Sequence, residues 1–378
     1  MENIPRIAMH TFNNYYPSEA AMLLRVNESL SSLVARRFEA AKEGDHLLFS
    51  PTHLSIVNSA GIPFQLRYCP ALAKKPSNLK PENEPKLPKQ PKFDPFKDPS
   101  PELLIASFPS HALVLNKFPV IPNHFIITTK EWKAQTDLLE KTDLQATYEC
   151  LQIWDDDGKT PRATPPTNRL FAFFNSGDES GASQPHRHLQ FLPVEAMRQQ
   201  GPGSESESEA WHPLIDLIEN QPQDDTSNSK FQHLPQLPFA HFALPLPPNP
   251  SPDTLHSIYL ALYRAAVACS EGRNALQETV STPSEGPAAV AYNLAMTLTT
   301  MMICPRRQET AQLPVDVAAA GQIEDHGVVS LNGTILASTL MVKAEGEWNA
   351  LRGNPEYLSR VLATVGYPKA DSQGTCLL

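Results

Sequence analysis

Proline is the feature that most restricts how this chain can fold, because the prolines are clustered. Nine of the 37 prolines lie in residues 70–101, together with seven lysines, and seven more lie in residues 235–252. A proline lacks a backbone N–H and fixes φ at about −65°, so neither segment can form a helix or a central strand. We therefore expect two long Pro-rich loops, the first of them basic. A third loop is expected over residues 200–210, where Gly201-Pro202-Gly203 precedes alternating Ser and Glu, a composition typical of a mobile acidic segment.

The regions between these loops carry the spacing of regular structure. Apolar residues recur at helical spacing over 18–42, ending near Gly44, and a second helix is expected over 253–270 with Asp253 as its cap. Asn332-Gly333 is expected to turn a hairpin. Hairpins joined by short turns predict an α+β fold with a mostly antiparallel sheet and flanking helices. The expected strands are 111–117, 124–129, 170–174, 185–192, 239–246, 290–297, 301–304, 327–331 and 335–342.

Composition and termini exclude several classes of protein. The 31 Lys+Arg and 41 Asp+Glu give a net charge of 31 − 41 = −10, which argues against a nucleic-acid binder. No apolar run approaches the 18 or so residues of a membrane span, and the N-terminus has no signal-peptide pattern. Five scattered cysteines without a C-x-x-C pair predict neither a disulfide framework nor a Cys-based zinc site. We expect a protein of the cytoplasm, or of the cytoplasm and nucleus.

Chemistry is concentrated in the expected strand 185–192. Side chains alternate along a strand, so His186, His188 and Gln190 share one face and Arg187 points to the other. A loop of Gly, Ser and Ala residues precedes this strand and allows backbone amides to approach an anion. Imidazole beside such a loop indicates nucleophilic attack on phosphorus through a phosphoramidate-type intermediate.

Two other interpretations of the histidine pair remain open on the residues alone. An H-x-H pair on a strand is also a common zinc site, which would make the protein a zinc-dependent phosphoesterase with His186 and His188 as ligands. Both histidines are equally compatible with a purely structural role. The neutral amide of Gln190 is a poor zinc ligand and a good donor to a phosphoryl oxygen, which favours phosphate chemistry. A third zinc ligand would have to come from His111, His124 or His212.

The residues around this strand resemble a known signature. FFNSG at 173–177 followed by SGASQPHRHLQ at 180–190 resembles the fungal diadenosine tetraphosphate (Ap4A) phosphorylases, or ATP adenylyltransferases. These belong to the branch of the histidine-triad (HIT) superfamily in which H-x-H-x-Q replaces H-x-H-x-H, alongside galactose-1-phosphate uridylyltransferase. The resemblance implies a HIT-like N-terminal catalytic region over 1–234 and an ATP adenylyltransferase-type lobe over 235–378. Further similar segments are 72–76, 115–118, 122–125, 291–294, 305–306 and 333–343.

The resemblance also implies an activity. His188 is expected to attack the α-phosphorus of Ap4A and release ATP, after which orthophosphate attacks the adenylyl-histidine and releases ADP. The reaction is expected to be reversible, with an ADP sulfurylase side activity, and His186 and Gln190 complete the catalytic set. A catalytically silent nucleotide-sensing module is a third hypothesis.

The resemblance further implies the ligands. The expected partners are diadenosine polyphosphates, ATP, ADP and phosphate, acting on a monomer or homodimer with no nucleic acid or membrane involved. A divalent cation such as Mg²⁺ is expected to accompany the nucleotide without a fixed protein site, and no organic cofactor is expected. The residues expected to bind nucleotide are Lys74, Lys75, Asn116, Lys117, Asn175, Ser176, Gly181, Ala182, Ser183, Gln184, Gln190, Asn293 and Arg306.

Overall fold

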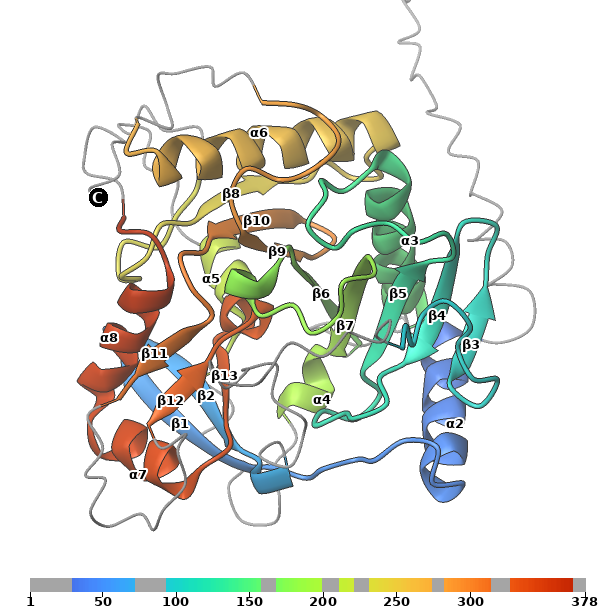
Figure 1. Ribbon diagram of the computed structural model, residues 1–378, viewed down its shortest axis with the longest axis horizontal. Coiled ribbons are helices and arrows are strands. Elements are labelled where there is room, and N and C mark those ends of the chain that lie inside the picture. The colour runs from blue at the N-terminus through green and yellow to red at the C-terminus, as the bar shows by residue number, and fades with distance from the viewer. Residues whose placement is uncertain are drawn as a thin grey trace, which may run out of the picture.

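An antiparallel sheet of eight strands forms the centre of the molecule (Figure 1). The computed structural model describes residues 29–71, 93–157, 168–198, 211–220, 231–273, 282–313 and 327–369. The sheet, with its flanking helices, confirms the predicted α+β fold. In spatial order its strands are β3 (Leu104–Ser107), β4 (His111–Leu115), β5 (Phe125–Thr129), β7 (His188–Pro193), β6 (Leu170–Asn175), β9 (Tyr292–Met296), β10 (Thr300–Pro305) and β8 (Phe242–Pro245).

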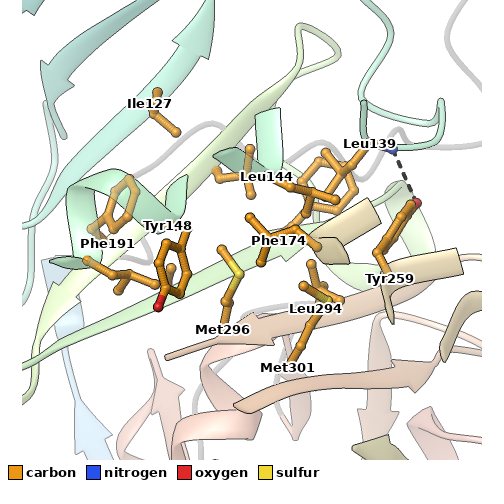
Figure 2. Packing of buried hydrophobic residues seen from close by; sticks show 14 of the residues in the cluster. Ile127, Leu139, Leu144, Tyr148, Phe174, Phe191, Tyr259, Leu294, Met296 and Met301 are labelled. Atoms are coloured by element: carbon orange, nitrogen blue, oxygen red, sulfur yellow. Dashed lines mark hydrogen bonds between the residues drawn. The ribbon is translucent and has the colours of Figure 1, made fainter. Parts of the chain in front are cut away.

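Three helices cover one face of this sheet: α2 (Leu30–Glu43), α3 (Lys141–Asp157) and α6 (Pro252–Ser270). Alternate residues of the central strands, among them Phe174, Phe191 and Met296, form the core beneath these helices (Figure 2). Burying each such side chain stabilises the fold by about 1.5–3 kcal/mol. The Tyr259 hydroxyl of α6 accepts a hydrogen bond from the Leu139 amide at 3.2 Å, which ties α6 to the start of α3.

The opposite face of the sheet is covered by a second layer. Phe171 and Phe173 of β6 and Ala295 of β9 join a separate apolar cluster with this layer. The elements of this cover are β1 (His53–Ser59), β2 (Ile62–Tyr68), β13 (Thr339–Val342), α4 (Val194–Arg198), α5 (Leu214–Glu219), η4 (Gly333–Ala337), β11 (Thr310–Gln312), β12 (Val328–Ser330), α7 (Glu345–Gly353) and α8 (Pro355–Val365). The cover thus consists of a three-stranded sheet of β1, β2 and β13, a two-stranded sheet of β11 and β12, short helices and a 3-10 helix.

Most of the expected hairpins are confirmed. Strand β4 pairs with β5, β6 with β7 and β9 with β10, each antiparallel, and β8 is an edge strand inside the Pro-rich segment 235–252. Strands β8, β9 and β10, which follow residue 234, lie in the same sheet as the earlier strands, and β9 pairs with β6. Among the described residues, no helix combines the length and apolarity that crossing a membrane requires.

The hairpin expected at Asn332-Gly333 is wrong. The Asn332 side chain accepts from the Thr334 amide at 3.0 Å and so begins η4, and β13 then pairs in parallel with β2. Gly333 packs so closely on β6 that an added Cβ would lie 2.6 Å from Cδ2 of Phe173. The pair predicts a turn locally, but contact with a distant strand determines its conformation.

Three smaller expectations have different outcomes. Helix α6 is capped by Ser251, whose hydroxyl accepts from the Thr254 amide, and Asp253 lies inside it. Helix α2 ends at Gly44 as expected, whereas the start of the predicted helix over 18–42 lies outside the described residues. Cys69, Cys150 and Cys304 are free and buried, whereas Cys269 is disulfide-bonded, a pairing that the scattered cysteines did not predict. Residues 72–92 and 200–210 also lie outside the described residues.

Candidate active site

His188 and Gln190 lie on the sheet face opposite α3 and α6, as alternation along β7 predicts. Strand β7 begins at His188, and His186 precedes it, in an isolated bridge with Ala134. The ring of Phe96, from the end of the first Pro-rich segment, lies 4.9 Å from the ring of His188 and 5.9 Å from that of His186, centre to centre. Both histidines are therefore buried against one aromatic side chain.

The tautomer of His188 follows from its hydrogen bonds. Its Nδ1 lies 2.8 Å from the His186 carbonyl oxygen, which can only accept, so Nδ1 carries the proton and donates. Nε2 then holds a lone pair, and no described residue forms a hydrogen bond with it. Burial lowers the pKa of His188 from its ordinary 6.5 to about 4. The ring is thus a neutral imidazole at physiological pH, with its nucleophilic nitrogen available.

Gln135 holds the backbone of His188 in place. Its side-chain oxygen accepts from the His188 amide at 2.8 Å, and its nitrogen donates to the carbonyls of Asn175 at 2.7 Å and His188 at 3.2 Å. The paired register between β6 and β7 stops at Phe173 and Gln190, so the Gln135 side chain bridges the two strands where they separate. Sequence reasoning missed this residue, because nothing in its own segment distinguishes it.

Both ring nitrogens of His186 are occupied by protein partners. Nδ1 lies 2.8 Å from the carboxylate of Asp94 and Nε2 lies 3.1 Å from the hydroxyl of Thr129. A metal ion would have to displace one of these partners to bind His186. In the described ranges no three His, Cys, Asp or Glu side chains are grouped as a metal site requires. The three histidines considered as a further zinc ligand contact other groups: His111 contacts Asp143, His124 contacts Asn116 and Gln190, and His212 contacts Arg198.

A short relay orients the amide of Gln190. The Asn116 side chain accepts from the Phe118 amide at 2.8 Å, so its nitrogen faces Nδ1 of His124 at 3.2 Å. Nε2 of His124 then donates to the side-chain oxygen of Gln190 at 3.0 Å. The Gln190 amide nitrogen is left with both protons, and no described residue accepts them. Gln190 thus presents a donor on the same face as His188.

Asn175, Asn293 and Arg306 lie beneath the loop that joins β6 to β7. Asn293 donates to the Asn175 side-chain oxygen at 2.9 Å and to the Ser180 carbonyl at 2.8 Å, and it accepts from Arg306. Arg306 also donates to the carbonyls of Gln308 and Leu331 at 3.0 Å each. All three side chains are buried, so the structure favours a role in shaping the loop over direct contact with a nucleotide. Ser176 likewise accepts from the Tyr292 amide at 2.7 Å.

The loop itself offers two free amides. The amides of Gly181 and Ala182 already donate to the carbonyls of Asp178 and Gly177, at 2.9 and 3.0 Å. The amides of Ser183 and Gln184 bond no described residue, so they are the members of the predicted anion cradle that remain available. Gly181 has φ +80°, and a Cβ there would lie 2.8 Å from the Leu331 carbonyl oxygen, so glycine is required at this position.

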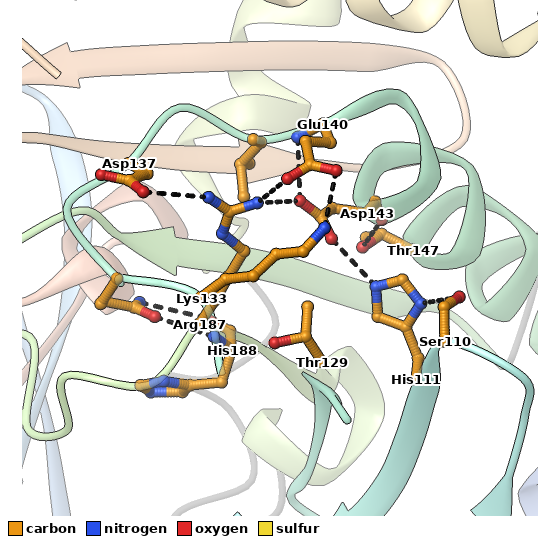
Figure 3. Close-up of polar contacts among 12 residues, drawn as sticks. Ser110, His111, Thr129, Lys133, Asp137, Glu140, Asp143, Thr147, Arg187 and His188 are labelled. Carbon is orange, nitrogen blue, oxygen red and sulfur yellow. Dashed lines mark hydrogen bonds and ion pairs between the residues drawn. The ribbon is translucent and has the colours of Figure 1, made fainter. Parts of the chain in front are cut away.

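Arg187 anchors the strand from the helix-covered face (Figure 3). Its guanidinium donates to Asp143 at 2.9 Å and Glu140 at 3.0 Å, and His111 contacts the other oxygen of Asp143 at 2.9 Å. Burial opposes ionisation of Asp143, but the hydrogen bond from His111 and the charge of Arg187 outweigh it and lower the pKa of this carboxyl. The carboxylate therefore stays charged and binds β7 to α3.

Known proteins match both halves of the chain. A model of the Ap4A phosphorylase N-terminal domain matches residues 20–203, and one of the ATP adenylyltransferase C-terminal domain matches residues 235–368. The chain belongs to the Ap4A phosphorylase family. Its members are nucleotidyltransferases, and the resemblance seen in the sequence is confirmed.

Two relatives of the family come from Saccharomyces cerevisiae. Protein APA1 is 25% identical over 93% of this chain and 98% of its own length. Diadenosine 5',5'''-P1,P4-tetraphosphate phosphorylase 2 is 26% identical over 92% of this chain and 98% of its own length. The crystal structure of yeast Ap4A phosphorylase Apa2 in complex with Ap4A has a TM-score of 0.68 at 23% identity, covering 91% of this chain and 99% of that one. The two proteins therefore share a fold over nearly their full lengths.

Three lysines were expected to bind nucleotide, and the structure describes only one of them. Lys117 is exposed, with its ammonium group 5.9 Å from the centre of the Phe118 ring, beside the Asn116 relay. Lys74 and Lys75 lie outside the described residues, so their place relative to His188 stays a prediction of the family resemblance.

Proposed function

We propose that this member of the Ap4A phosphorylase family converts Ap4A and orthophosphate to ATP and ADP through an adenylyl group on His188. The observation that supports the proposal most directly is the geometry of His188. Its Nδ1 proton is held by the His186 carbonyl, its Nε2 has no protein partner among the described residues, and burial keeps the ring neutral. A neutral imidazole fixed in this tautomer is a nucleophile that needs no separate base.

Two displacements account for the reaction. In the first, the Nε2 lone pair bonds to the α-phosphorus of one adenosine, and the P–O bond to the neighbouring phosphate breaks, so that ATP leaves with the bonding electrons. In the second, an oxygen of orthophosphate bonds to the same phosphorus and the P–N bond breaks. ADP is released, and the lone pair returns to His188. The reverse sequence makes Ap4A and phosphate from ATP and ADP.

The negative charge on the oxygens of the transferred phosphoryl group is stabilised by hydrogen-bond donors and does not require a general acid. We assign this role to the free protons of the Gln190 amide, which lies on the same strand face as His188, and to the amides of Ser183 and Gln184, which bond no described residue. Lys117, together with Lys74 and Lys75, supplies positive charge for the remaining phosphates. A divalent cation bound to the polyphosphate completes the neutralisation, without ligands from the protein.

The test is to incubate the purified protein with Ap4A and Mg²⁺ in the absence of phosphate and to measure its intact mass. We expect one added adenylate per chain, which disappears with release of ADP when phosphate is added. Binding of Ap4A without any label would instead support a nucleotide-sensing module. Stoichiometric zinc, with hydrolysis that does not require phosphate, would support the phosphoesterase.

The same intermediate predicts a side activity. Sulfate and phosphate are both tetrahedral oxyanions, so sulfate attacking the adenylyl-histidine formed from ADP would give an adenylyl sulfate. We propose that this ADP sulfurylase reaction is slower than phosphorolysis. We also propose that the enzyme works in the cytoplasm, which holds ATP, ADP and phosphate. Replacing phosphate with labelled sulfate in the second step of the mass experiment tests the side activity.

A further inference from the structure

Two exposed aromatic rings line one pocket near the active site. The large apolar side chains that are exposed in the described residues are Leu48, Phe93, Phe118 and Trp132. Phe93, 85% exposed, and Trp132, 62% exposed, both border a pocket of about 430 Å³. Leaving two large rings in water forgoes the free energy of burying them, and exposed apolar groups gathered in a concave site are typical of ligand binding.

The pocket adjoins the catalytic histidines directly. One of its walls is Asp94, whose carboxylate lies 2.8 Å from Nδ1 of His186, and another is Pro185, the residue before His186. Phe96, which covers His188, is two residues from Asp94 in the chain. A ligand that fills the pocket therefore ends beside the row of His186, His188 and Gln190.

The row of His186, His188 and Gln190 has two ends, and different side chains surround each end. Gln190, with the Asn116 relay and Lys117, lies at one end, and His186 with the aromatic pocket lies at the other. Four residues of extended chain separate Gln190 from His186, or about 13 Å. The substrate of the proposed reaction likewise has two ends, because each carries an adenosine and only one of them is next to the phosphorus that reacts.

We propose that this pocket binds the second nucleoside of the dinucleotide, the one that leaves with ATP, by stacking its adenine on Trp132 with Phe93 as the opposite wall. Stacking is the interaction by which aromatic side chains hold bases without reading their edges. Asp98 and Lys97 also line the pocket, and we assign to them the ribose hydroxyls and the first phosphate beyond the ribose, because a carboxylate accepts from hydroxyls and an ammonium group attracts a phosphate. The two carboxylates of the pocket disfavour the phosphates themselves, which keeps these beside the histidines. The inference rests on the proposed function.

Kinetics can separate this site from the catalytic one, because one half of the reaction uses only one adenosine. Exchange of labelled phosphate into ADP needs only adenylyl transfer to and from His188, whereas phosphorolysis of Ap4A also needs the second nucleoside. In Trp132→Leu we expect KM for Ap4A to rise ten- to a hundredfold, with ADP–phosphate exchange within about twofold of wild type. Trp132→Phe, which keeps a ring, should raise KM less than about fivefold.

A matched control is Trp348→Leu, which removes a partly buried tryptophan of α7 that packs on Tyr68. We expect it to leave both reactions unchanged once the folded fraction is matched by thermal melting. Equal loss of phosphorolysis and exchange in Trp132→Leu would overturn the proposal, and so would an unchanged KM for Ap4A.

Binding of ATP can be followed without turnover. The wild type should show quenching of tryptophan fluorescence by ATP that Trp132→Phe lacks. Quenching in a protein that never becomes adenylylated would support the pocket and contradict the proposed function. Absence of quenching in an active enzyme would overturn the pocket alone.

Discussion

His188 and His241 are two buried histidines with the same local arrangement and different surroundings. In each, Nδ1 lies near the carbonyl oxygen of the residue two positions earlier, at 2.8 Å for His188 and 2.9 Å for His241. In each, burial lowers the pKa from 6.5 to about 4. They differ at Nε2, which in His241 accepts from the Leu234 amide at 2.8 Å and in His188 has no partner among the described residues.

The difference shows what separates a structural histidine from a reactive one in this fold. Burial and a carbonyl partner select the neutral tautomer at both positions, so neither feature identifies a nucleophile. The second nitrogen decides, because the hydrogen bond from Leu234 occupies the lone pair of His241. At His188 no described residue bonds that lone pair, so it stays available to a substrate.

The largest difference between the two histidines is expected when each is replaced by alanine. His188→Ala should lower the rate of adenylyl transfer by at least about 10⁴-fold while the protein stays folded. His241→Ala should leave the activity of the folded protein within about twofold and lower its unfolding free energy by about 1–3 kcal/mol, because the Leu234 amide loses its acceptor. Stopped-flow labelling and denaturant unfolding measure the two effects. Equal activity loss in both variants would refute the distinction.

A second prediction concerns the side chain that holds the backbone of His188. Gln135→Leu removes the bridge to His188 and should lower kcat about 10- to 100-fold with little change in KM, because the ring is displaced relative to the phosphorus. Gln65→Leu is the matched control, since Gln65 is equally buried and donates to the Met197 carbonyl at 2.9 Å away from the histidines. It should cost stability but not kcat. A Gln135→Leu enzyme with normal kcat would show that β7 positions His188 unaided.

A third prediction uses pH, which acts on both histidines alike. In the unfolded chain both histidines have a pKa of 6.5, whereas in the folded protein their pKa is about 4. The unfolded state therefore binds more protons in this range, and the folded protein loses stability as pH falls from 6.5 towards 4. Each histidine should contribute roughly 3 kcal/mol to that loss. Denaturant unfolding between pH 4.5 and 7 should show a shallower dependence in His241→Ala than in wild type. Over the same range the adenylylation rate of folded protein should show no acid limb near 6.5.

The smallest effect is expected from the support of His186. Thr129→Val keeps the shape of the side chain but removes the hydroxyl that lies 3.1 Å from Nε2 of His186. Because the hydrogen bond from His188 goes to the His186 carbonyl and not to its ring, we expect kcat to fall by about threefold and stability by about 1 kcal/mol. Steady-state kinetics with Ap4A measure the change, and a loss above a hundredfold would mean that the His186 ring contacts the substrate.

Much of the site was predictable because it follows from the local chain. Alternation along a strand correctly placed His188 and Gln190 on one face and Arg187 on the other, and the family signature identified the reaction. The same local reasoning failed at Asn332-Gly333, where the packing of Gly333 on Phe173 of β6 outweighs the turn preference of the pair. It also could not distinguish Asn293 and Arg306 as groups beneath the loop, since their partners lie far away in sequence.

The periodicity of the strands, the H-x-H-x-Q row and the basic Pro-rich segment could be read from the sequence, because each depends on residues joined by a few peptide bonds. Only the tertiary structure decided that Gln135 bridges His188 to Asn175, that Phe96 covers both histidines and that Trp132 and Phe93 share a pocket. Such contacts join segments separated by tens of residues. They exist because eight strands and their helices pack in one arrangement, and no local pattern encodes which distant side chains that arrangement brings together.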